Sequence, residues 1–501
     1  MRELIKKAWK QDRGAALAII ATSMFLLMGV AAISADLAWY YLNTSRVQRT
    51  ADAAALAGVV YLPHETATAN STAIDIANRN GYDNTLADVS VTPTVISENQ
   101  LQVRVSDEVD TFFAKVLGWN SMTIARTAVA EYIPPLKLGS PENQFGNDCD
   151  PGQPGCPPQT ANFWANIHGK WTQRSMGDAY SSWCTNAPDN PGCNQNPFAR
   201  STGYLYGIES PGSFTVEFND LAFHNTSGGN PTGDYIRTGD RGCEDWGPST
   251  AADCGPTMVV TLYGPDPTPL DVSNNPVLCT ATIPPLPQVP ETDPYDWLRP
   301  DQIPGATSDT GCWTQSGDGY ILQVRHLDPG NTTNRAGLNR YGVRANGGAG
   351  TNLFALGDFS IYNNFSGSTT SFHLAEVPTY YHGKTFVVEL FDAGESAANG
   401  TLQVIDPTGS VFDDGECRIY SRNNPASNWS LQTTISAGGD CQELVTPGEY
   451  NDRWLKFEMD LSPTYSCTNC WWKMNYVYTS PVNDTTTWRA YMIGNPIHII
   501  D

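Results

Sequence analysis

The stretch from Gly14 to Ala35 constrains the fold more than any other feature of the sequence. It contains 22 residues and no charged side chain. As a helix it would span roughly 30 Å, the thickness of the hydrocarbon core of a bilayer. Basic residues precede it, and Trp39, Tyr40 and Tyr41 follow it. Because basic flanks stay in the cytoplasm and aromatic residues favour the interface, we expect a cytoplasmic tail at 1–13 and a transmembrane helix at 14–35. The rest of the chain would then lie outside the cytoplasm, held at the cell membrane by a single pass.

A cleaved signal peptide is the alternative interpretation of this stretch. The apolar core of a signal peptide is normally about 7–15 residues long and ends at a cleavage site of small residues. The apolar run here is longer, and residues 36–62 continue as a helical pattern with no loop that a peptidase could enter. We therefore expect an uncleaved anchor.

Charge and cysteine content fit a chain whose bulk lies outside the cell. The net charge is −23, and because residues 1–13 carry +3, the remainder carries −26. Such an acidic chain is poorly suited to binding nucleic acid. All 12 cysteines lie beyond residue 148, and an even number in an oxidising compartment indicates disulfides. Zinc sites are the alternative, but the sequence has a single CxxC pattern.

The sequence cannot determine which cysteines pair, and we predict that consecutive cysteines do. The expected pairs are Cys149–Cys156, Cys184–Cys193, Cys243–Cys254, Cys279–Cys312, Cys417–Cys441 and Cys467–Cys470.

Residues 36–133 have the pattern of a small extracytoplasmic α+β domain. The first helix should continue to about Tyr61, since good helix formers dominate up to Pro63. Further helices are expected at Ser71–Asn80 and at Asp110–Gly118, where Asp110 would be the N-cap. Alternating apolar and polar residues predict strands, which are expected at Ala87–Val91, Leu101–Val105 and Met122–Tyr132.

This part of the chain, about residues 10–133, resembles the TadE/TadG-like proteins of the tight-adherence (Tad/Flp) pilus assembly system. The most specific motif is Gln48–Gly58, QRTADAAALAG. The other segments that carry the resemblance are Arg13–Ala16, Asp36–Tyr41, Phe112–Gly118 and Ala125–Ala130. The resemblance implies a structural role in pilus assembly, with other Tad assembly proteins as partners.

One position departs from the pilin-like members of that group. Members that are cut by a prepilin peptidase have a glycine before the cut and a glutamate five residues later. Gly14 is present as a candidate processing site, but the later position holds Ile19. The resemblance therefore favours a membrane-retained, TadG-like protein over a major pilin. Asp36, at the end of the apolar stretch, is expected to be solvated at the interface or to contact an assembly partner.

The sequence beyond residue 133 predicts a linker and two all-β modules. Residues 134–160 are rich in proline and glycine, as in a stiff linker. Short alternating strands then predict jelly-roll-like β-sandwich modules at 161–348 and 351–501. Local matches, such as Met258–Asp266 with Phe386–Glu395, suggest that the two modules are repeats. Chance similarity between aromatic-rich β segments is the alternative.

Acidic turns in the second module are the best candidates for a metal site. Two turns carry carboxylates beside glycines, and carboxylate oxygens on a flexible loop suit Ca²⁺. The candidate ligands are Asp392, Glu395, Asp413, Asp414 and Glu416. Solvated turn residues are the alternative, and no other cofactor is indicated.

No catalytic motif is present, and we expect that the chain is not an enzyme. Abundant Trp and Tyr residues could form exposed rows that bind surface glycans or a partner, or they could form the core. The sequence thus favours a membrane-anchored, TadG-like pilus component whose β-sandwiches serve adhesion or partner binding. A surface carbohydrate-binding protein unrelated to pili is the alternative, and a surface hydrolase is a third candidate.

Overall fold

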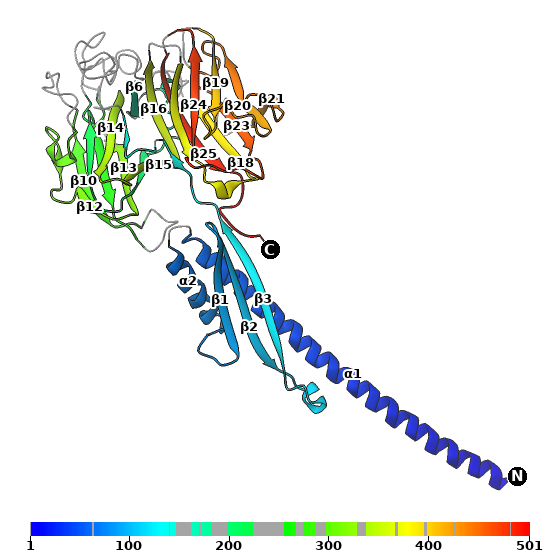
Figure 1. Ribbon diagram of the computed structural model, residues 1–501. Helices are drawn as coiled ribbons and strands as arrows, with labels where there is room; N and C mark the ends of the chain where they lie inside the picture. Colours follow the sequence, from blue (N-terminus) through cyan, green and yellow to red (C-terminus); the bar gives the residue numbers. More distant parts are fainter. Residues whose placement is uncertain are drawn as a thin grey trace. The chain divides into compact units, whose positions relative to one another are not determined.

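The chain divides into two compact units, and each is described by itself. The small unit contains Met1–Pro134 and Gly494–Asp501, and the large unit contains Pro135–Ile493. The computed structural model (Figure 1) describes residues 2–62, 65–139, 141–146, 162–169, 172–181, 196, 198–223, 255–266, 274–285, 297–327, 337–365, 369–394, 398–423, 427–480 and 482–500.

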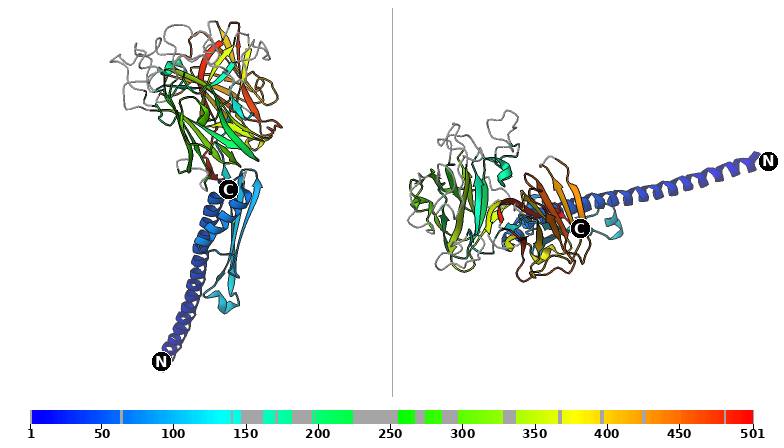
Figure 2. Two further views of the ribbon diagram at one scale, coloured as in Figure 1. Left: turned by 90° about the vertical axis from the view of Figure 1, so that its left-hand side faces the viewer. Right: turned by 90° about the horizontal axis from the view of Figure 1, so that it is seen from above.

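One long helix organises the small unit. Helix α1 (Arg2–Val59) runs through the apolar stretch and on into the folded domain without a break. Its second half lies along one face of a small sheet, whereas its first half extends beyond the sheet (Figures 1 and 2). A shorter helix, α2 (Thr66–Arg79), packs against it. The predicted continuation of the first helix past the apolar stretch is therefore confirmed, and the second predicted helix begins five residues earlier than expected.

The small sheet has four antiparallel strands. Its order is β1 (Val89–Ser97), β2 (Gln100–Asp110), β3 (Ser121–Tyr132) and β26 (Ile497–Ile499). In β2, Leu101, Val103 and Val105 are fully buried and alternate with less buried polar residues, as expected for a sheet with one covered face. The first three strands were predicted from the sequence. The last residues were expected in the second module, whereas here they return to the small unit.

Small residues let the two helices approach closely. Val47, Ala51, Ala55 and Val59 of α1 are fully buried, as are the three core alanines of α2. A Cβ atom added at Gly58 would lie 2.6 Å from the carbonyl oxygen of Ala69 and 2.5 Å from a methyl carbon of Leu101. Only glycine fits at this position without a shift of the backbone.

The helix predicted at Asp110–Gly118 is wrong. Asp110 is the last residue of β2, and the segment forms a 3₁₀ helix of four residues at Ala114–Leu117. The backbone N–H groups that Asp110 was expected to cap are instead bound by the carboxylate of Asp36 on α1. The contact with Asp36 therefore takes the place of the local helix cap that was expected from Asp110.

In the part of the large unit that the structure describes, two sheets of eleven strands are formed, and every strand pairing within them is antiparallel. The first sheet has the order β11 (Thr307–Ser308), β10 (Val277–Ile283), β9 (Met258–Tyr263), β13 (Tyr320–His326), β7 (Tyr204–Glu209), β15 (Asn352–Leu356), β4 (Lys137–Leu138), β17 (Thr369–Glu376), β24 (Trp471–Tyr478), β19 (Gly400–Ile405) and β22 (Gln442–Val445).

The second sheet has the order β12 (Thr314–Ser316), β8 (Ser213–Asn219), β14 (Leu338–Gly347), β6 (Asn162–His168), β16 (Asp358–Phe365), β25 (Val482–Met492), β18 (Thr385–Phe391), β23 (Trp454–Asp460), β20 (Cys417–Arg422) and β21 (Ser430–Ile435), with β5 (Gln144–Phe145) beside β14.

Aromatic side chains join the facing sides of these two sheets. Phe372 of β17 lies 5.1 Å from Trp488 of β25 between ring centroids, and Trp472 of β24 lies 5.2 Å from Phe386 of β18. The hydroxyls of Tyr206 and Tyr341 are hydrogen-bonded across the same interior. The aromatic residues that were candidates for exposed rows therefore lie largely in the core. The jelly-roll connectivity of the modules stays a prediction.

Both large sheets run through the two predicted modules without interruption. The proline-rich segment expected to be a linker contributes β4, which pairs with β15, and its Leu138 also pairs with β17. The matched segments of the proposed repeat take different places. Strand β9 lies in the first sheet between β10 and β13, whereas its match β18 lies in the second sheet between β25 and β23. The sequence match thus reflects similar β patterns and not equivalent positions.

Candidate functional site

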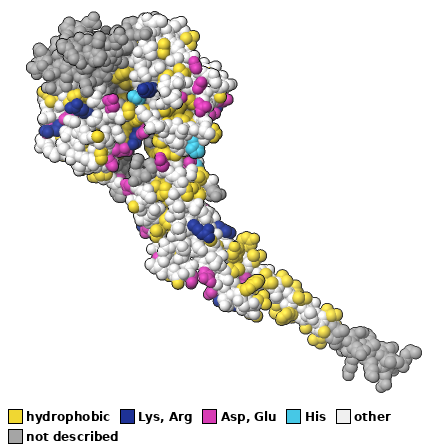
Figure 3. Space-filling view, in the orientation of Figure 1, with side chains coloured by type: hydrophobic (Ala, Val, Ile, Leu, Met, Phe, Trp, Pro, Cys, Tyr) yellow, Lys and Arg dark blue, Asp and Glu magenta, His cyan; other side chains and the backbone are white. Residues whose placement is uncertain are grey.

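The exposed half of α1 is the clearest functional surface of the small unit. From Ala16 onward this helix is long and apolar enough to cross a membrane, and no residue in its most apolar part is buried. Hydrophobic side chains cover this part of the helix (Figure 3). Two hydroxyls on it donate to carbonyl groups one turn earlier, Thr22 to Ala18 and Ser34 to Val30, both at 2.7 Å. Polar atoms on an apolar helix are thereby satisfied without water.

The candidate processing residue Gly14 lies inside this continuous helix. Ile19, the residue at the position where cut pilins have glutamate, is 67% exposed. An exposed isoleucine suits a helix surrounded by lipid and provides no carboxylate for a neighbouring subunit. That the chain is left uncut at Gly14 stays a prediction.

Asp36 follows the apolar stretch directly and is buried, contrary to the expectation of a solvated side chain. Its carboxylate accepts hydrogen bonds from the backbone N–H groups of Phe112, Phe113 and Ala114, at 2.8, 3.0 and 2.7 Å. Charge-assisted bonds of this kind are stronger than neutral ones. Asp36 therefore fixes the end of the β2–β3 hairpin beside the helix. No local pattern in the sequence indicates this contact, because 76 residues separate the partners.

The predicted calcium ligands are not gathered in one place by the described residues. Asp392 is buried, has a positive φ of 60° and accepts the backbone N–H of Asp452. Asp413 and Asp414 are exposed, and Glu416 pairs with Arg418 at 2.6 Å. Glu395 lies outside the described residues. Within the described part of the chain no group of three or more His, Cys, Asp or Glu side chains is arranged to hold a metal. Calcium binding stays a prediction.

Three of the predicted cysteine pairs are present in the structure. They are Cys279–Cys312, Cys417–Cys441 and Cys467–Cys470. The partners of the other three expected pairs, Cys149–Cys156, Cys184–Cys193 and Cys243–Cys254, lie outside the described residues. All three observed bridges join neighbours in the sequence, as the pairing rule predicted.

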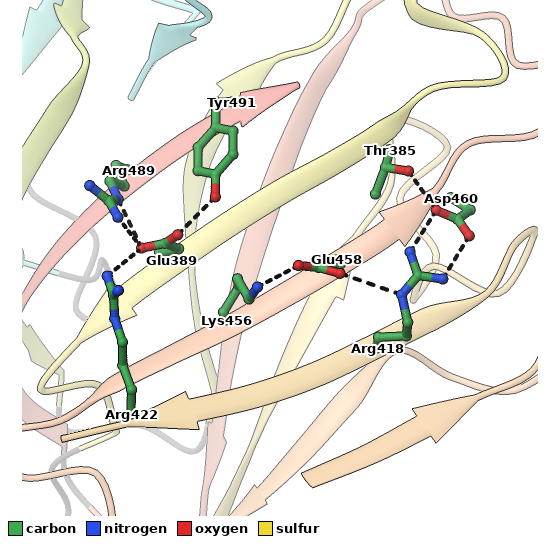
Figure 4. Close-up of polar contacts among 9 residues, drawn as sticks. All are labelled: Thr385, Glu389, Arg418, Arg422, Lys456, Glu458, Asp460, Arg489 and Tyr491. Atoms are coloured by element: carbon green, nitrogen blue, oxygen red, sulfur yellow. Dashed lines mark hydrogen bonds and ion pairs between the residues drawn. The ribbon is translucent and has the colours of Figure 1, made fainter. Parts of the chain in front are cut away.

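A ladder of charged side chains crosses one face of the second large sheet (Figure 4). We call it the charged ladder. Residues two apart on a strand share a face, so β23 places Lys456, Glu458 and Asp460 together while Leu455, Phe457 and Met459 face the core. The members are Glu389 on β18, Arg418 and Arg422 on β20, Lys456, Glu458 and Asp460 on β23, and Arg489 on β25.

Glu389 is the buried centre of one end of the ladder. Its side chain is 1% exposed and pairs with Arg489 at 2.6 Å and Arg422 at 3.3 Å. Tyr491 donates its hydroxyl to the same carboxylate at 2.9 Å. Burial and the nearby Glu389 raise the pKa of Tyr491, so its hydroxyl keeps its proton as a donor. Arg422 also stacks on Trp429, 4.0 Å from the ring centroid.

Arg418 is the centre of the other end. It binds both oxygens of Asp460 at 2.9 Å and also pairs with Glu416. Thr385 donates its hydroxyl to Asp460 at 2.7 Å. The hydrogen bonds from Arg418 hold the pKa of Asp460 below its usual range, although partial burial opposes them. A carboxylate kept ionised in this way is a poor proton donor, so this end of the ladder is not suited to act as a general acid.

The large unit also contains a pocket of about 180 Å³. Its lining includes the aromatic residues Phe145, Trp164, Phe372 and Trp488 together with His373. Burial, aided by Lys473, lowers the pKa of His373 to about 4, so its ring is neutral at pH 7. Aromatic faces with a neutral polar group suit a small uncharged ligand. Sequence reasoning missed both the pocket and the ladder, because their residues come from distant strands.

Comparison with known proteins identifies one segment of the chain. Residues 14–63 match the Tad family model, described as "Putative Flp pilus-assembly TadE/G-like". The match covers the exposed apolar half of α1 and the half that packs on the small sheet. None of the curated proteins searched matches the chain.

Proposed function

We propose that this protein is a single-pass, membrane-anchored component of a Tad-type pilus assembly. The observation that carries the proposal is the TadE/G-like match at residues 14–63, which coincides with the helix that leaves the apolar stretch and enters the small unit. The N-terminal tail lies in the cytoplasm, and both folded units lie outside it. The disulfides of the large unit fit an oxidising compartment.

The large unit serves adhesion or partner binding in this proposal. Together with the adjacent Glu416, its charged ladder has four basic and four acidic side chains, although the chain as a whole carries −23. A balanced polar face can meet another protein without the repulsion that a strongly acidic surface imposes. Other Tad assembly proteins are the partners expected for the helix and the small unit.

Two measurements test the proposal. Mass spectrometry of the protein from its native membrane should find an intact N-terminal tail, and a terminus at Ala15 would contradict the proposal that this tail is left uncut. A strain that lacks the protein should lose pili, and the full chain should restore them. Normal pili in that strain would contradict a role in assembly.

A surface carbohydrate-binding protein without a pilus role is the second candidate, and the aromatic pocket favours it. The full chain in detergent should then bind neutral sugars on a glycan array, and His373→Gln should weaken that binding. Binding together with normal pili in the deletion strain would favour this candidate over pilus assembly.

A further inference from the structure

The end of the β2–β3 hairpin exposes an unusually apolar surface. Five of its large apolar side chains are more than half exposed: Phe112 60%, Phe113 51%, Val116 88%, Leu117 71% and Trp119 69%. Soluble surfaces rarely carry such a concentrated apolar patch unless another body covers it.

The position of this hairpin end indicates what covers it. Asp36, which binds its backbone, comes directly after the apolar stretch 14–35. Trp39 on α1 contacts the ring of Phe112 edge-on, with 5.4 Å between centroids. The hairpin end therefore lies level with the end of the transmembrane stretch, at the depth where aromatic residues meet lipid headgroups.

The backbone of the hairpin end is suited to a medium with little water. Besides the three N–H groups bound by Asp36, those of Val116, Gly118 and Trp119 donate to carbonyl groups of Phe113, Lys115 and Ala114. Thr111 closes the base by donating its hydroxyl to the carbonyl group of Trp119. Insertion into lipid is unfavourable for unpaired backbone groups, and this turn pairs these donors internally.

The charge at the hairpin end is also compatible with lipid. Lys115 is the one charged residue between Asp110 and Asn120, and it lies 3.5 Å from Asp110 at the base of the turn. A lysine at this depth can bury its stem and direct its ammonium group to lipid phosphates.

We propose that the β2–β3 hairpin end inserts its apolar side chains into the outer leaflet of the membrane that α1 crosses. The inference rests on the proposed anchoring of Gly14–Ala35 in that membrane. With two membrane contacts held together by Asp36, the small unit cannot turn about the axis of α1 and presents one fixed side to the bilayer.

Fluorescence quenching by lipid tests this contact in the full-length protein. A genetically encoded fluorescent amino acid is placed at Val116, at Phe25 in the apolar stretch, or at Ile96. Ile96 is 48% exposed near the end of β1, next to the turn that leads into the other end of β2. Each protein is reconstituted in nanodiscs whose phospholipids carry bromine both near the headgroup end and near the methyl end of the acyl chains, so that probes at either depth can be quenched. We expect the probes at Val116 and Phe25 to lose about half of their emission, and the probe at Ile96 to keep its emission.

The outcomes separate this inference from the anchor itself. A bright probe at Val116 beside a quenched probe at Phe25 would overturn the hairpin contact and leave the anchor in place. A bright probe at Phe25 would overturn the anchor and the hairpin contact together.

A second substitution tests the role of Asp36. Asp36→Ala removes the acceptor for three backbone N–H groups and should reduce quenching at Val116 without changing it at Phe25. The matched control is Asp110→Ala, because Asp110 is 81% exposed and its described ion pair at this turn is with Lys115. Unchanged quenching at Val116 in the Asp36→Ala variant would contradict a hairpin held to the membrane by this contact.

Discussion

The cores of the two units are packed with opposite kinds of side chain, small in one and bulky in the other. In the small unit, alanines and one obligatory glycine bring α1 and α2 together, and residues 1–134 and 494–501 contain no cysteine. In the large unit, tryptophan, tyrosine and phenylalanine fill the space between two sheets, and disulfides and a buried ion-pair network reinforce it.

This difference indicates how each unit is stabilised. A long helix that packs on a sheet and on a second helix is held by close contact along its length, where small side chains are best. Wide sheets with long connections need bulky cores and cross-links. The two units should therefore respond to different perturbations, and the following experiments test that from the largest effect to the smallest.

Reduction of the disulfides should destabilise the large unit alone. Closing a loop such as the one between Cys417 and Cys441 restricts the unfolded chain, and its loss should lower the free energy of unfolding by about 3 kcal/mol. Hydrogen exchange measured peptide by peptide, with and without reductant, separates the units. Faster exchange in β2 and β3 upon reduction would contradict the independence of the small unit.

Glu389→Gln should lower the stability of the large unit by about 2–4 kcal/mol. The substitution leaves the nearly buried Arg422 and the part-exposed Arg489 without their shared carboxylate. Denaturant unfolding measures the change. The matched control is Glu416→Gln, because Glu416 pairs with an arginine of the same ladder but is 46% exposed; it should change stability by less than about 1 kcal/mol. Equal losses of stability in the two variants would contradict the prediction that the buried ion pairs contribute more than the exposed one.

Gly58→Ala should destabilise the small unit by about 1–3 kcal/mol, although alanine is the better helix former. The added methyl group would meet the backbone of Ala69 and force the helices apart. The same substitution at Gly29 meets nothing within 4 Å and serves as the control. Hydrogen exchange in α2 is the measurement, and unchanged protection in the Gly58 variant would show that the helices can adjust.

His373 should make the stability of the large unit depend on pH. Burial lowers its pKa to about 4, whereas the unfolded chain takes up the proton near pH 6.5. The neutral ring therefore does not lower the free energy of unfolding above about pH 6.5. As the pH drops towards 4, uptake of a proton by the unfolded chain lowers that free energy, by about 1–2 kcal/mol at pH 5. The urea midpoint of His373→Gln should decline less between pH 7 and pH 5. Parallel declines in the two proteins would rule out this histidine as the cause.

The features that depend on local pattern were predictable from the sequence. The apolar stretch, the continuation of α1 and the strands of the first hairpin follow from composition and periodicity. The three described disulfides agree with the predicted pairing of consecutive cysteines, which the sequence alone could not determine. The capping of Phe112 by Asp36 was not predictable, because a carboxylate next to an apolar helix gives no sign of a partner far along the chain. The charged ladder was missed for the same reason, since Glu389 and Arg489 meet only after two strands pair.

The return of the C-terminus to the small sheet has a mechanical consequence. Ile497 of β26 pairs with Tyr132 of β3, so the chain leaves the small sheet and comes back to it on adjoining strands. A force that pulls on the large unit is then shared by two chain connections, one that continues from β3 and one that leads back to β26. If the three residues of β26 separated from β3, the connection that continues from β3 would carry the whole force. The large unit would then stay attached to the small unit through that connection.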